Sequence, residues 1–559
     1  MASEIDIRDG LFRVLLTYGI DSVPTAIHLE HPEDMSHGDF STNIALSYAK
    51  QLGLSPQVLA KKFVAELGEI ITVERIEIAG PGFINFFLKP DVFANTISAI
   101  SHEPSHWGKN QLHIGEKIMV EFTDPNPFKE FHIGHLMSNA IGESVSRLLE
   151  YAGARVTRVN YQGDVGPHVA KAVWALQKFN LDSRSAAELG RAYAAGATAY
   201  EKEPEAKQEI DVINTQIYDR SNPVVNEIYD AGRKTSLKHF EAIYVLLGTK
   251  FDHYFFESET APRGIALVRN HLDVFTESEG AIVYQGEKDG LHTRVFITSR
   301  ATPTYEAKDL GLLAMKQEYG ALDRSITVTA HEQADYFAVM LAAARHMPEL
   351  AEIAEKTSHL SHGMMRFAEG KMSSRTGNVI TGEGLLAELA DAAGERAIKS
   401  RATDAGVLAA QIAVGAIKFQ ILRQSSGKDI VFDRSRALSL EGDSGPYLQY
   451  THARTEQVVA KAKVEEVVAI YNTETRPSLL VRLVAHFPLE VRRATELREP
   501  HLVATYLTEL SAVFNRWYAE EKILDGTPEA AHKVAVTNAV RVTLKNGLYL
   551  LGIPAPEQM

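Results

Sequence analysis

Residues 121–153 constrain the fold more than any other stretch, because they predict a strand end, a turn and a helix in that order. Apolar residues alternate over 118–122, which is the period of a strand, and a turn with two prolines ends this strand near Thr123. Apolar residues then recur at helical spacing until Gly153, which favours a left-handed helix end. A second strand is predicted over 154–161. Such a unit is a parallel crossover, and its ligand site lies where the first strand passes to the helix N-terminus.

The quartet His-Ile-Gly-His at 132–135 opens this predicted helix. Gly134 lets the ring of a ligand approach the backbone. The imidazoles of His132 and His135 can donate hydrogen bonds to phosphate oxygens where the helix N-terminus already favours anions. Histidines near a helix start also occur as capping or surface groups. The position of the quartet after a strand and a proline-containing turn favours a site for a nucleoside triphosphate.

A second motif, GKMSSRTGN at 370–378, lies far downstream in a glycine-flanked predicted loop. The two motifs together resemble the signature sequences of class I aminoacyl-tRNA synthetases. Further segments extend over nearly the whole chain: HGDFSTNIAL (37–46), IEIAGPGFINFFL (76–88), VEFTDPN (120–126), NYQGDVGPH (160–168), TYEAKDLG (304–311), HEQADYF (331–337), GPYLQYTHART (445–455) and GLYLLGIPAPEQM (547–559). These segments resemble the arginyl-tRNA synthetase family, including its N-terminal domain.

The resemblance implies an arginine–tRNA ligase. Such an enzyme activates L-arginine with ATP to arginyl-adenylate and transfers the arginyl group to the 3′ end of its tRNA, releasing AMP and pyrophosphate. A class I synthetase for another amino acid is a second interpretation. A tRNA-binding paralogue without catalysis is a third, and the intact quartet counts against it. An unrelated nucleotidylyltransferase on the same fold would leave the helical C-terminal third unexplained.

Composition sets broad limits on this interpretation. The chain has 559 residues, of which 45% are hydrophobic and 23% charged, as expected for a globular protein of about three domains. The net charge of −14 argues mildly against nucleic acid, although a local basic face can lie on an acidic body. The absence of cysteine excludes disulfides and thiolate metal sites, and together with the lack of a visible targeting segment it favours the cytoplasm. No apolar run is expected to span a membrane.

Three domains are predicted. Residues 1–108 mix helical and strand patterns, which is typical of a small α+β domain. Residues 109–385 predict an α/β, Rossmann-like catalytic domain with a helical insertion at about 170–280, after which strand signals at 281–286 and 293–298 continue the sheet. Helix-period segments over 386–559 predict an all-α bundle. By the resemblance, the first domain contacts tRNA and the last binds the anticodon.

A pocket for arginine requires carboxylates, because a guanidinium is a planar fork of donors that never becomes neutral. By the resemblance, five residues bind arginine: its side chain is held by Glu121, Tyr305 and Asp309, and its α-amino group by Asn126 and Gln333. Asp309 is alternatively a helix cap and Tyr305 a core ring with one wet edge. Glu257 is either a third acid of the pocket or an ordinary loop carboxylate.

The second motif departs from its class pattern, because Ser374 stands where a second lysine is usual. Lys129, three residues before the quartet, resembles the lysine that compensates for this change, although a lone loop lysine commonly faces solvent. The resemblance implies ATP binding by His132, Gly134, His135, Lys371, Met372, Ser373 and Ser374, with catalysis by His132, His135, Lys129, Lys371 and Arg375. These groups meet the negative charge that develops on the leaving pyrophosphate.

Metal binding by the protein itself is not expected. The segment beginning at His331 resembles the start of a metalloprotease helix, but Asp335 stands where that motif needs a second histidine. Magnesium is expected to enter with ATP.

In the C-terminal bundle, aromatic rings alternate with positive charge, a combination that can stack on unpaired bases. Tyr450, Arg454 and Trp517 are the candidates for anticodon binding, although aromatics at helical spacing are also typical of a core. The expected partners are tRNA for arginine, ATP and L-arginine. No membrane is expected, and the protein is expected to be a monomer.

Overall fold

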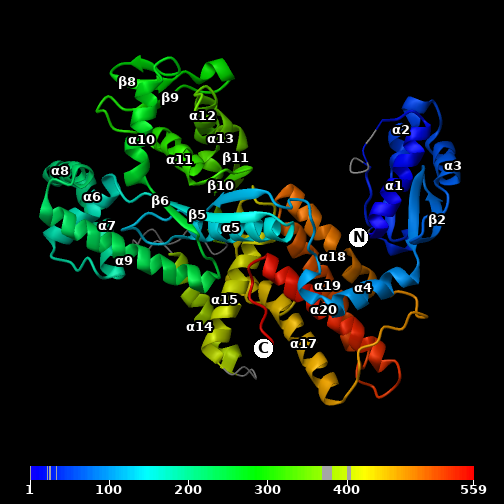
Figure 1. Cartoon of the computed structure of the whole chain (residues 1–559). Coiled ribbons are helices and arrows are strands. Elements are labelled where there is room, and N and C mark those ends of the chain that lie inside the picture. Colours follow the sequence, from blue (N-terminus) through cyan, green and yellow to red (C-terminus); the bar gives the residue numbers. More distant parts are fainter. Residues whose placement is uncertain (1, 22, 24–26, 33, 368–380, 399–403) are drawn as a thin grey trace.

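The computed structural model describes residues 2–21, 23, 27–32, 34–367, 381–398 and 404–559 (Figure 1). A parallel sheet lies at the centre of the molecule. Insertion helices lie to its left in this view, a second α/β part lies above it, the C-terminal helices lie below, and the N-terminal domain lies to the right (Figure 1).

The N-terminal domain is a three-stranded antiparallel sheet covered by helices, with strand order β1-β3-β2. Its elements are α1 (Ala2–Thr17), η2 (Met35–His37), β1 (Phe40–Thr42), α2 (Ile44–Leu52), α3 (Pro56–Leu67), β2 (Val73–Ala79) and β3 (Phe83–Leu88), followed by α4 (Pro90–His102) and η3 (Pro104–His106). Gly82, at φ 135°, shapes the turn of the β2–β3 hairpin. A buried ion pair, Asp39 with Arg482 at 2.7 Å, links this domain to the C-terminal helices.

The central sheet contains five parallel strands in the order β11-β10-β4-β5-β6. They are β4 (Lys117–Glu121), β5 (Arg155–Gln162), β6 (His253–Phe256), β10 (Arg324–Ala330) and β11 (Thr357–His362). The chain adds strands on one side of β4 and later on the other, so the strand order reverses between β4 and β10. Across this junction Glu121 pairs with Thr327. An α/β fold with a parallel sheet was predicted and is confirmed.

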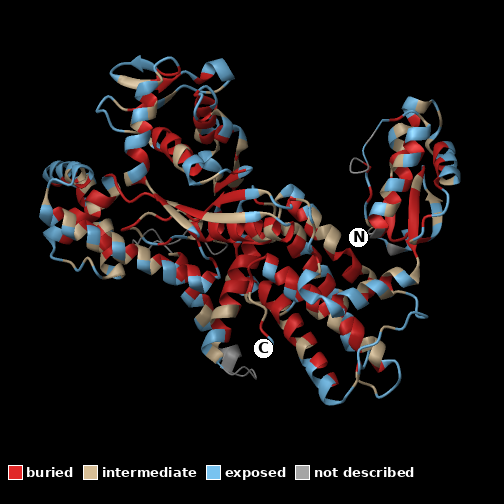
Figure 2. Cartoon of the chain, in the orientation of Figure 1, coloured by how far each residue is buried: buried red, intermediate tan, exposed pale blue. Residues whose placement is uncertain are grey.

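The predicted strand–turn–helix is β4 followed by α5 (Ile133–Tyr151). The strand ends at Glu121, slightly before the predicted Thr123, and Gly153 follows the helix with φ 89° as expected. Almost every residue of α5 is buried, because the sheet covers one side of the helix and C-terminal helices cover the other (Figure 2).

The insertion is helical but ends earlier than predicted. It contains α6 (Pro167–Lys178), α7 (Ala186–Lys202), α8 (Pro204–Asp219) and α9 (Pro223–Leu247). These helices share a hydrophobic cluster with Phe128 and Val165, while the C-terminal part of α9 packs in the main core. The following strand, β6, belongs to the central sheet, so the range 170–280 merges an insertion with part of the catalytic fold.

The strand signals at 281–286 and 293–298 are real, but their assignment to the main sheet was wrong. They form a separate antiparallel sheet, β7 (Thr276–Ser278), β8 (Ala281–Tyr284) and β9 (Arg294–Ile297), with η4 (Gly286–Asp289) between its last two strands. Alternating hydrophobicity predicts a strand and does not show which sheet the strand joins. The surrounding elements are α10 (Glu257–Asn270), α11 (Tyr305–Tyr319), η5 (His331–Gln333), α12 (Ala334–Arg345) and α13 (Ala351–Lys356).

The C-terminal part is predominantly helical. It contains α14 (Gly382–Ile398), α15 (Ala405–Leu422), α16 (Arg434–Ala437), α17 (Gly445–Val464), α18 (Leu479–Leu497), α19 (His501–Glu520) and α20 (Ala530–Leu550). A short parallel pair, β12 (Met365–Phe367) with β13 (Ile430–Phe432), joins it to the catalytic part.

The expectation that no apolar run reaches membrane-spanning length was wrong for α15. This helix of 18 residues has a mean hydropathy of 1.6, and among the described helices it alone is long and apolar enough to cross a membrane. Within the protein, however, 72% of it is buried. A helix that is apolar on all sides is also typical of the centre of a large helical core.

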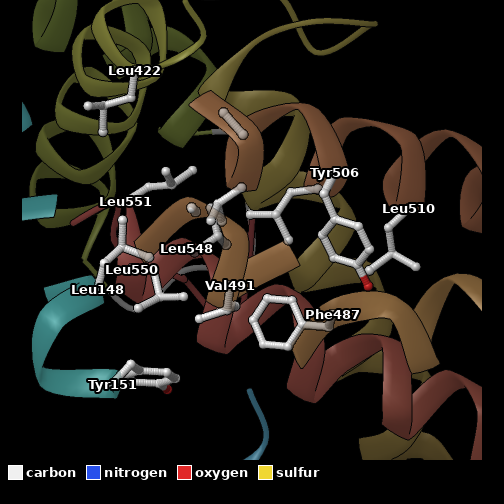
Figure 3. Packing of buried hydrophobic residues seen from close by; sticks show 14 of the residues in the cluster. Leu148, Tyr151, Leu422, Phe487, Val491, Tyr506, Leu510, Leu548, Leu550 and Leu551 are labelled. Atoms are coloured by element: carbon white, nitrogen blue, oxygen red, sulfur yellow. The ribbon is translucent and has the colours of Figure 1, made fainter. Parts of the chain in front are cut away.

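The C-terminal helices and α5 form one continuous hydrophobic core (Figure 3). Leu148 of α5 lies in this cluster with Val491 of α18 and Leu548 of α20. Hydrogen bonds join the same elements: Ser144 Oγ donates to the carbonyl of Leu550 at 2.7 Å. The helix that begins at the histidine quartet is therefore held at its other end by the bundle.

Candidate active site

A cavity of about 450 Å³ opens at the carboxyl ends of β4 and β10. This is the position where the strand order reverses, and open parallel sheets bind ligands at such a point. The cavity is lined by both histidines of the quartet and by residues from the loop after β4, the end of β5, α10, α11, β10 and α12. The fold thus brings segments from distant parts of the sequence to one site.

The turn between β4 and α5 has an unusual backbone. Thr123, Asp124 and Phe128 all have positive φ, at 81°, 47° and 68°, which is costly for residues other than glycine. Specific bonds hold the turn in place: the Thr123 amide donates to Ser138 Oγ at 2.9 Å, and the Phe128 amide donates to Ser236 Oγ at 2.9 Å. This geometry directs Thr123, Asp124 and Asn126 to the cavity, while Phe128 packs against the insertion helices.

The two histidines of the quartet are oriented by the backbone of α5. His132 is the N-cap, and its Nδ1 accepts from the amide of Gly134 at 3.1 Å. Nδ1 of His135 accepts from the amide of His132 at 3.2 Å, and the two rings stack with centroids 3.6 Å apart. Desolvation, with the nearby charge of Lys129, lowers the pKa of both imidazoles. A neutral ring whose Nδ1 accepts must carry its proton on Nε2, which leaves Nε2–H as a donor.

All five residues predicted to bind arginine line this one cavity, namely Glu121, Asn126, Tyr305, Asp309 and Gln333. Tyr305 lies at the N-terminus of α11 with 65% of its surface exposed, whereas Glu121 and Asp309 are buried. Asn126 Oδ1 accepts from the amide of Gly163 at 3.1 Å. Gly163 must be small, because a Cβ there would lie 2.4 Å from Asn126 Oδ1.

Two of the cavity acids are already paired with lysines of α11. Lys316 Nζ lies 2.5 Å from Glu121 Oε2, and Lys308 Nζ lies 2.6 Å from Glu257 Oε2. Glu257, left open by the sequence, is therefore a cavity residue and not a loop carboxylate on the surface.

Asp309 and Asp124, which also line the cavity, have neutral partners. Asp309 accepts a hydrogen bond from the Tyr336 hydroxyl at 3.1 Å, and Asp124 accepts one from the amide of Tyr161 at 2.8 Å. Burial and the charge of Glu121 raise the pKa of Asp309 to about 8. The same two causes raise the pKa of Asp124 well above its usual range.

Sequence reasoning missed Asp124, Lys308, Lys316 and Tyr336. One signal was available for Lys316: it follows Asp309 by seven residues and Tyr305 by eleven, spacings that place all three on one face of a helix. Asp124 lies within a segment already singled out, but nothing in the pattern of that segment shows which way its side chain points.

Lys129 is not among the residues that line the cavity, but it lies near them. Its ammonium lies over the ring of Tyr193 from α7, 5.2 Å from the ring centroid. Its positive charge is close enough to lower the pKa of His132 and His135. The carboxylate of Glu257 in turn favours the charged form of Lys129. A free surface lysine would not have these neighbours.

The second motif cannot be placed in the same way. Its predicted residues Lys371, Met372, Ser373, Ser374 and Arg375 lie outside the described residues. Within the described ranges, no group of three or more His, Cys, Asp or Glu side chains could hold a metal ion.

The candidate anticodon residues lie on α17 and α19. The Arg454 guanidinium lies between two rings, 4.7 Å from the centroid of Tyr450 and 4.8 Å from that of Tyr518. Its Nη2 also donates to the Tyr450 hydroxyl at 3.1 Å. Trp517 is half-buried and packs against the core. His452, in the same segment, is fully buried and cannot stack on a base.

Comparison with known families decides the identity of this arrangement. Residues 97–434 match a family model described as "tRNA synthetases class I (R), catalytic domain". The chain belongs to the arginyl-tRNA synthetase family. A model of the "Arginyl tRNA synthetase N terminal domain" matches residues 6–88, and one of the "DALR anticodon binding domain" matches residues 448–559.

Individual members of the arginyl-tRNA synthetase family match over nearly the full chain. Proteins named arginine–tRNA ligase from Treponema denticola and Treponema pallidum are 30% and 31% identical, over 96% and 95% of this chain and 95% and 94% of theirs. The solved arginyl-tRNA synthetase of Thermus thermophilus superposes with a TM-score of 0.78 at 25% identity, covering 99% of both chains. The Plasmodium falciparum structure, at 20% identity and a TM-score of 0.78, shows the same fold. The resemblance and the fold class inferred from the sequence are confirmed.

Proposed function

We propose that this protein is an arginine–tRNA ligase that activates L-arginine with ATP and transfers it to the 3′ end of its tRNA. Family membership supports the reaction. The observation that carries the substrate is the cavity beside α5, where five carboxylates, one of them the exposed Glu332, meet the two imidazoles of the quartet. The neighbourhood of acid and imidazole suits a cationic amino acid whose carboxylate attacks a phosphate.

The acids define one end of the proposed site. Glu121 and Glu257 are paired with lysines, so Asp124 and Asp309, together with the exposed Glu332, leave an excess of negative potential when ionised. A guanidinium satisfies this potential and donates in a plane to more than one acceptor. Tyr305, at the mouth, would close over the side chain. Asn126 Oδ1 and Gln333 lie on the cavity wall and would accept from the α-amino group.

The imidazoles define the other end. We propose that Nε2–H of His132 and His135 donates to phosphate oxygens of ATP, with Gly134 leaving room for the ligand. The substrate carboxylate attacks the α-phosphorus, and pyrophosphate leaves as negative charge builds on it. Catalysis by this chain is therefore positioning and electrostatic stabilisation, with Lys129 and, from the second motif, Lys371 and Arg375 as the cations. Magnesium, entering with ATP, would supply further phosphate neutralisation.

The remaining assignments follow the domain matches. We propose that the N-terminal domain contacts tRNA and that residues 386–559 bind the anticodon, with Tyr450, Arg454 and Trp517 as candidates. The ring–guanidinium–ring stack around Arg454 supports this proposal, because it presents aromatic faces beside positive charge on an accessible helix pair. We also propose a cytoplasmic monomer that takes ATP, L-arginine and tRNA, which the cysteine-free composition suits.

A charging assay tests the proposal. The protein is incubated with ATP, total tRNA and each of the standard amino acids in turn, and acylated tRNA is scored. Arginine alone should give product. Charging with a different amino acid would establish another synthetase, and no charging with any amino acid would establish a paralogue without catalysis.

A further inference from the structure

Lys316 is a fully buried lysine of α11 that neither the sequence motifs nor the proposed reaction gives a role. It is 1% exposed. Its ammonium lies 2.5 Å from Glu121 Oε2 and donates to Thr327 Oγ1 at 3.3 Å. Lysine is rarely buried to this degree unless it is paired. The pair must therefore be explained by what it does for Glu121.

Lys316 lies where it can contact two neighbouring strands of the central sheet. Glu121 ends β4, and Thr327 is its register partner on β10, so the ammonium binds both strands at the point where the strand order reverses. Only one oxygen of Glu121 is used in this way. The contact with Lys316 is made through Oε2, and Glu121 lines the cavity. Lys316 thus holds the carboxylate from below and leaves one oxygen for a ligand.

The pair also changes the charge that a ligand meets. Because Lys316 offsets charge on Glu121 and Lys308 offsets charge on Glu257, the cavity carboxylates without a paired cation are Asp309, Asp124 and the exposed Glu332. Glu121 remains a good hydrogen-bond acceptor, while Lys316 offsets part of its charge. Two cavity carboxylates with different roles therefore face one ligand.

We propose that Lys316 is a positioning residue for arginine recognition, which fixes Glu121 and offsets part of its charge so that Glu121 selects mainly by hydrogen-bond geometry and Asp309 mainly by charge. This inference rests on the proposed function. A guanidinium gains from such a division, because its donors lie in a plane and reach both carboxylates at once. A lysine ammonium gains mainly from charge. The pair therefore favours arginine over lysine.

Removal of the ammonium would change the protonation of Glu121. A buried carboxylate without its cation takes up a proton, and arginine must then expel that proton in order to bind. The groups that face Glu121 from the neighbouring elements include acids and phenols and only one cation: Asp124, Tyr161 of β5, Asp309 and Lys316 of α11, and Tyr336 of α12. No second cation is present among these groups to replace Lys316.

The test compares wild type with Lys316→Met, which keeps the apolar stem and removes the charge. The KM for arginine, measured with ATP and tRNA present, should rise about a hundredfold while the KM for ATP changes little. Titration calorimetry of L-arginine in two buffers of different ionisation enthalpy should show about one additional proton released per arginine bound. The preference for arginine over lysine should fall. Lys418→Met, which removes an equally buried lysine that does not line the cavity, is the matched control and should change none of these values.

Two further variants separate positioning from folding. Lys316→Arg keeps the charge and should restore most of the affinity without the additional proton. The double variant E121Q with K316M removes both charges, and it should fold and bind arginine better than E121Q alone, since E121Q leaves Lys316 unpaired. If Lys316→Met fails to fold, this double variant decides. An unchanged arginine KM in Lys316→Met, or no advantage of the double variant over E121Q, would overturn the inference. Failure of the wild-type protein to charge arginine would instead reject the proposed function.

Discussion

Asp309 is a buried acid that lacks a cationic partner among the described residues, and this gives arginine binding a distinctive pH dependence. Burial and the charge of Glu121 raise its pKa to about 8 in the free protein. A bound guanidinium favours the ionised carboxylate and lowers this pKa. Below pH 8, binding must therefore release a proton.

The raised pKa of Asp309 sets the direction in which arginine affinity changes with pH. The affinity for arginine should be low in acid and rise with pH, by about tenfold per pH unit at most, until it levels off near pH 8. Equilibrium titration of L-arginine between pH 6 and 9 measures it. Asp309→Asn removes the titrating group, so it should weaken binding on the order of a hundredfold and flatten the profile. Glu332→Gln, the same exchange at an exposed position on the cavity wall, is the control and should leave the profile unchanged. A profile in Asp309→Asn that still rises toward pH 8 would assign the titration to another group.

Gly163 also contributes to the arginine site, because the absence of a side chain leaves room for Asn126. The residue follows β5, and a Cβ at this position would lie 2.4 Å from Asn126 Oδ1 and 3.2 Å from the Glu257 carboxyl. Gly163→Ala should therefore displace the Asn126 side chain while the backbone stays in place.

Because Asn126 is proposed to accept from the α-amino group of arginine, Gly163→Ala should raise the arginine KM about tenfold or more, the cost of one hydrogen bond to a charged group. The melting temperature should change little. Gly394→Ala in α14, where no heavy atom lies within 4 Å of the added Cβ, is the matched control. Loss of stability together with an unchanged arginine KM would show that Gly163 serves packing alone.

Among the secondary-structure elements, the turn before α5 carries the proposed compensation for Ser374. The side chain of Lys129 extends from this turn over the ring of Tyr193, and its charge lowers the pKa of both histidines of the quartet. Because charge on pyrophosphate develops mainly in the transition state, Lys129→Ala should slow adenylate formation about 10²–10³-fold and change ATP binding little. A rapid-quench measurement with arginine, ATP and tRNA checks the rate.

The control and the rescue for Lys129 use other lysines. Lys178→Ala removes a lysine that also lies over a ring, that of Trp174, and should leave the rate intact. Combining Lys129→Ala with Ser374→Lys should recover part of the rate. A normal rate in Lys129→Ala would mean that Lys371, Arg375 and magnesium suffice.

The elements also show which parts of the fold could be predicted from the sequence. β4, α5 and β5 were predictable, because their periodicity and the glycine and prolines that bound them are local. The assignment of β8 and β9 to the main sheet failed, since strand pairing depends on partners distant in sequence. The role of Lys316 could not be predicted for the same reason. It depends on an ion pair with Glu121, and no local pattern predicts a contact between residues so far apart in the chain.

In the whole molecule, the catalytic sheet and the C-terminal bundle share one core. α5 begins at the histidine quartet, and its second half packs against α15, α18 and α20. Carbonyls at the end of α20 accept from α5: Ser144 Oγ bonds to Leu550 and Arg147 Nη1 to Tyr549, both within 2.8 Å. The insertion differs, because most of its buried apolar residues, Leu189 among them, form a second cluster that meets the catalytic part at Phe128 and Val165. A change in the bundle should therefore affect α5 directly, whereas a change at Leu189 should affect α6–α9 and the turn at Phe128 before it affects α5.

Leu548 of α20 tests this difference, since it is completely buried in the shared core (Figure 3). Leu548→Ala should lower the free energy of unfolding by about 2–5 kcal/mol, because it removes buried methyl groups and leaves a cavity that the neighbouring side chains fill only in part. Amide hydrogen exchange followed by mass spectrometry should then show faster exchange in α5 as well as in α20, because the two helices open as one unit. Leu189→Ala is the matched change in the insertion core, and it should speed exchange in α6–α9 while α5 keeps its protection. If Leu548→Ala loosened α20 and left α5 as protected as in the wild type, the bundle and the catalytic sheet would be separate cooperative units, and the anticodon-binding helices could not influence the histidine quartet through this core.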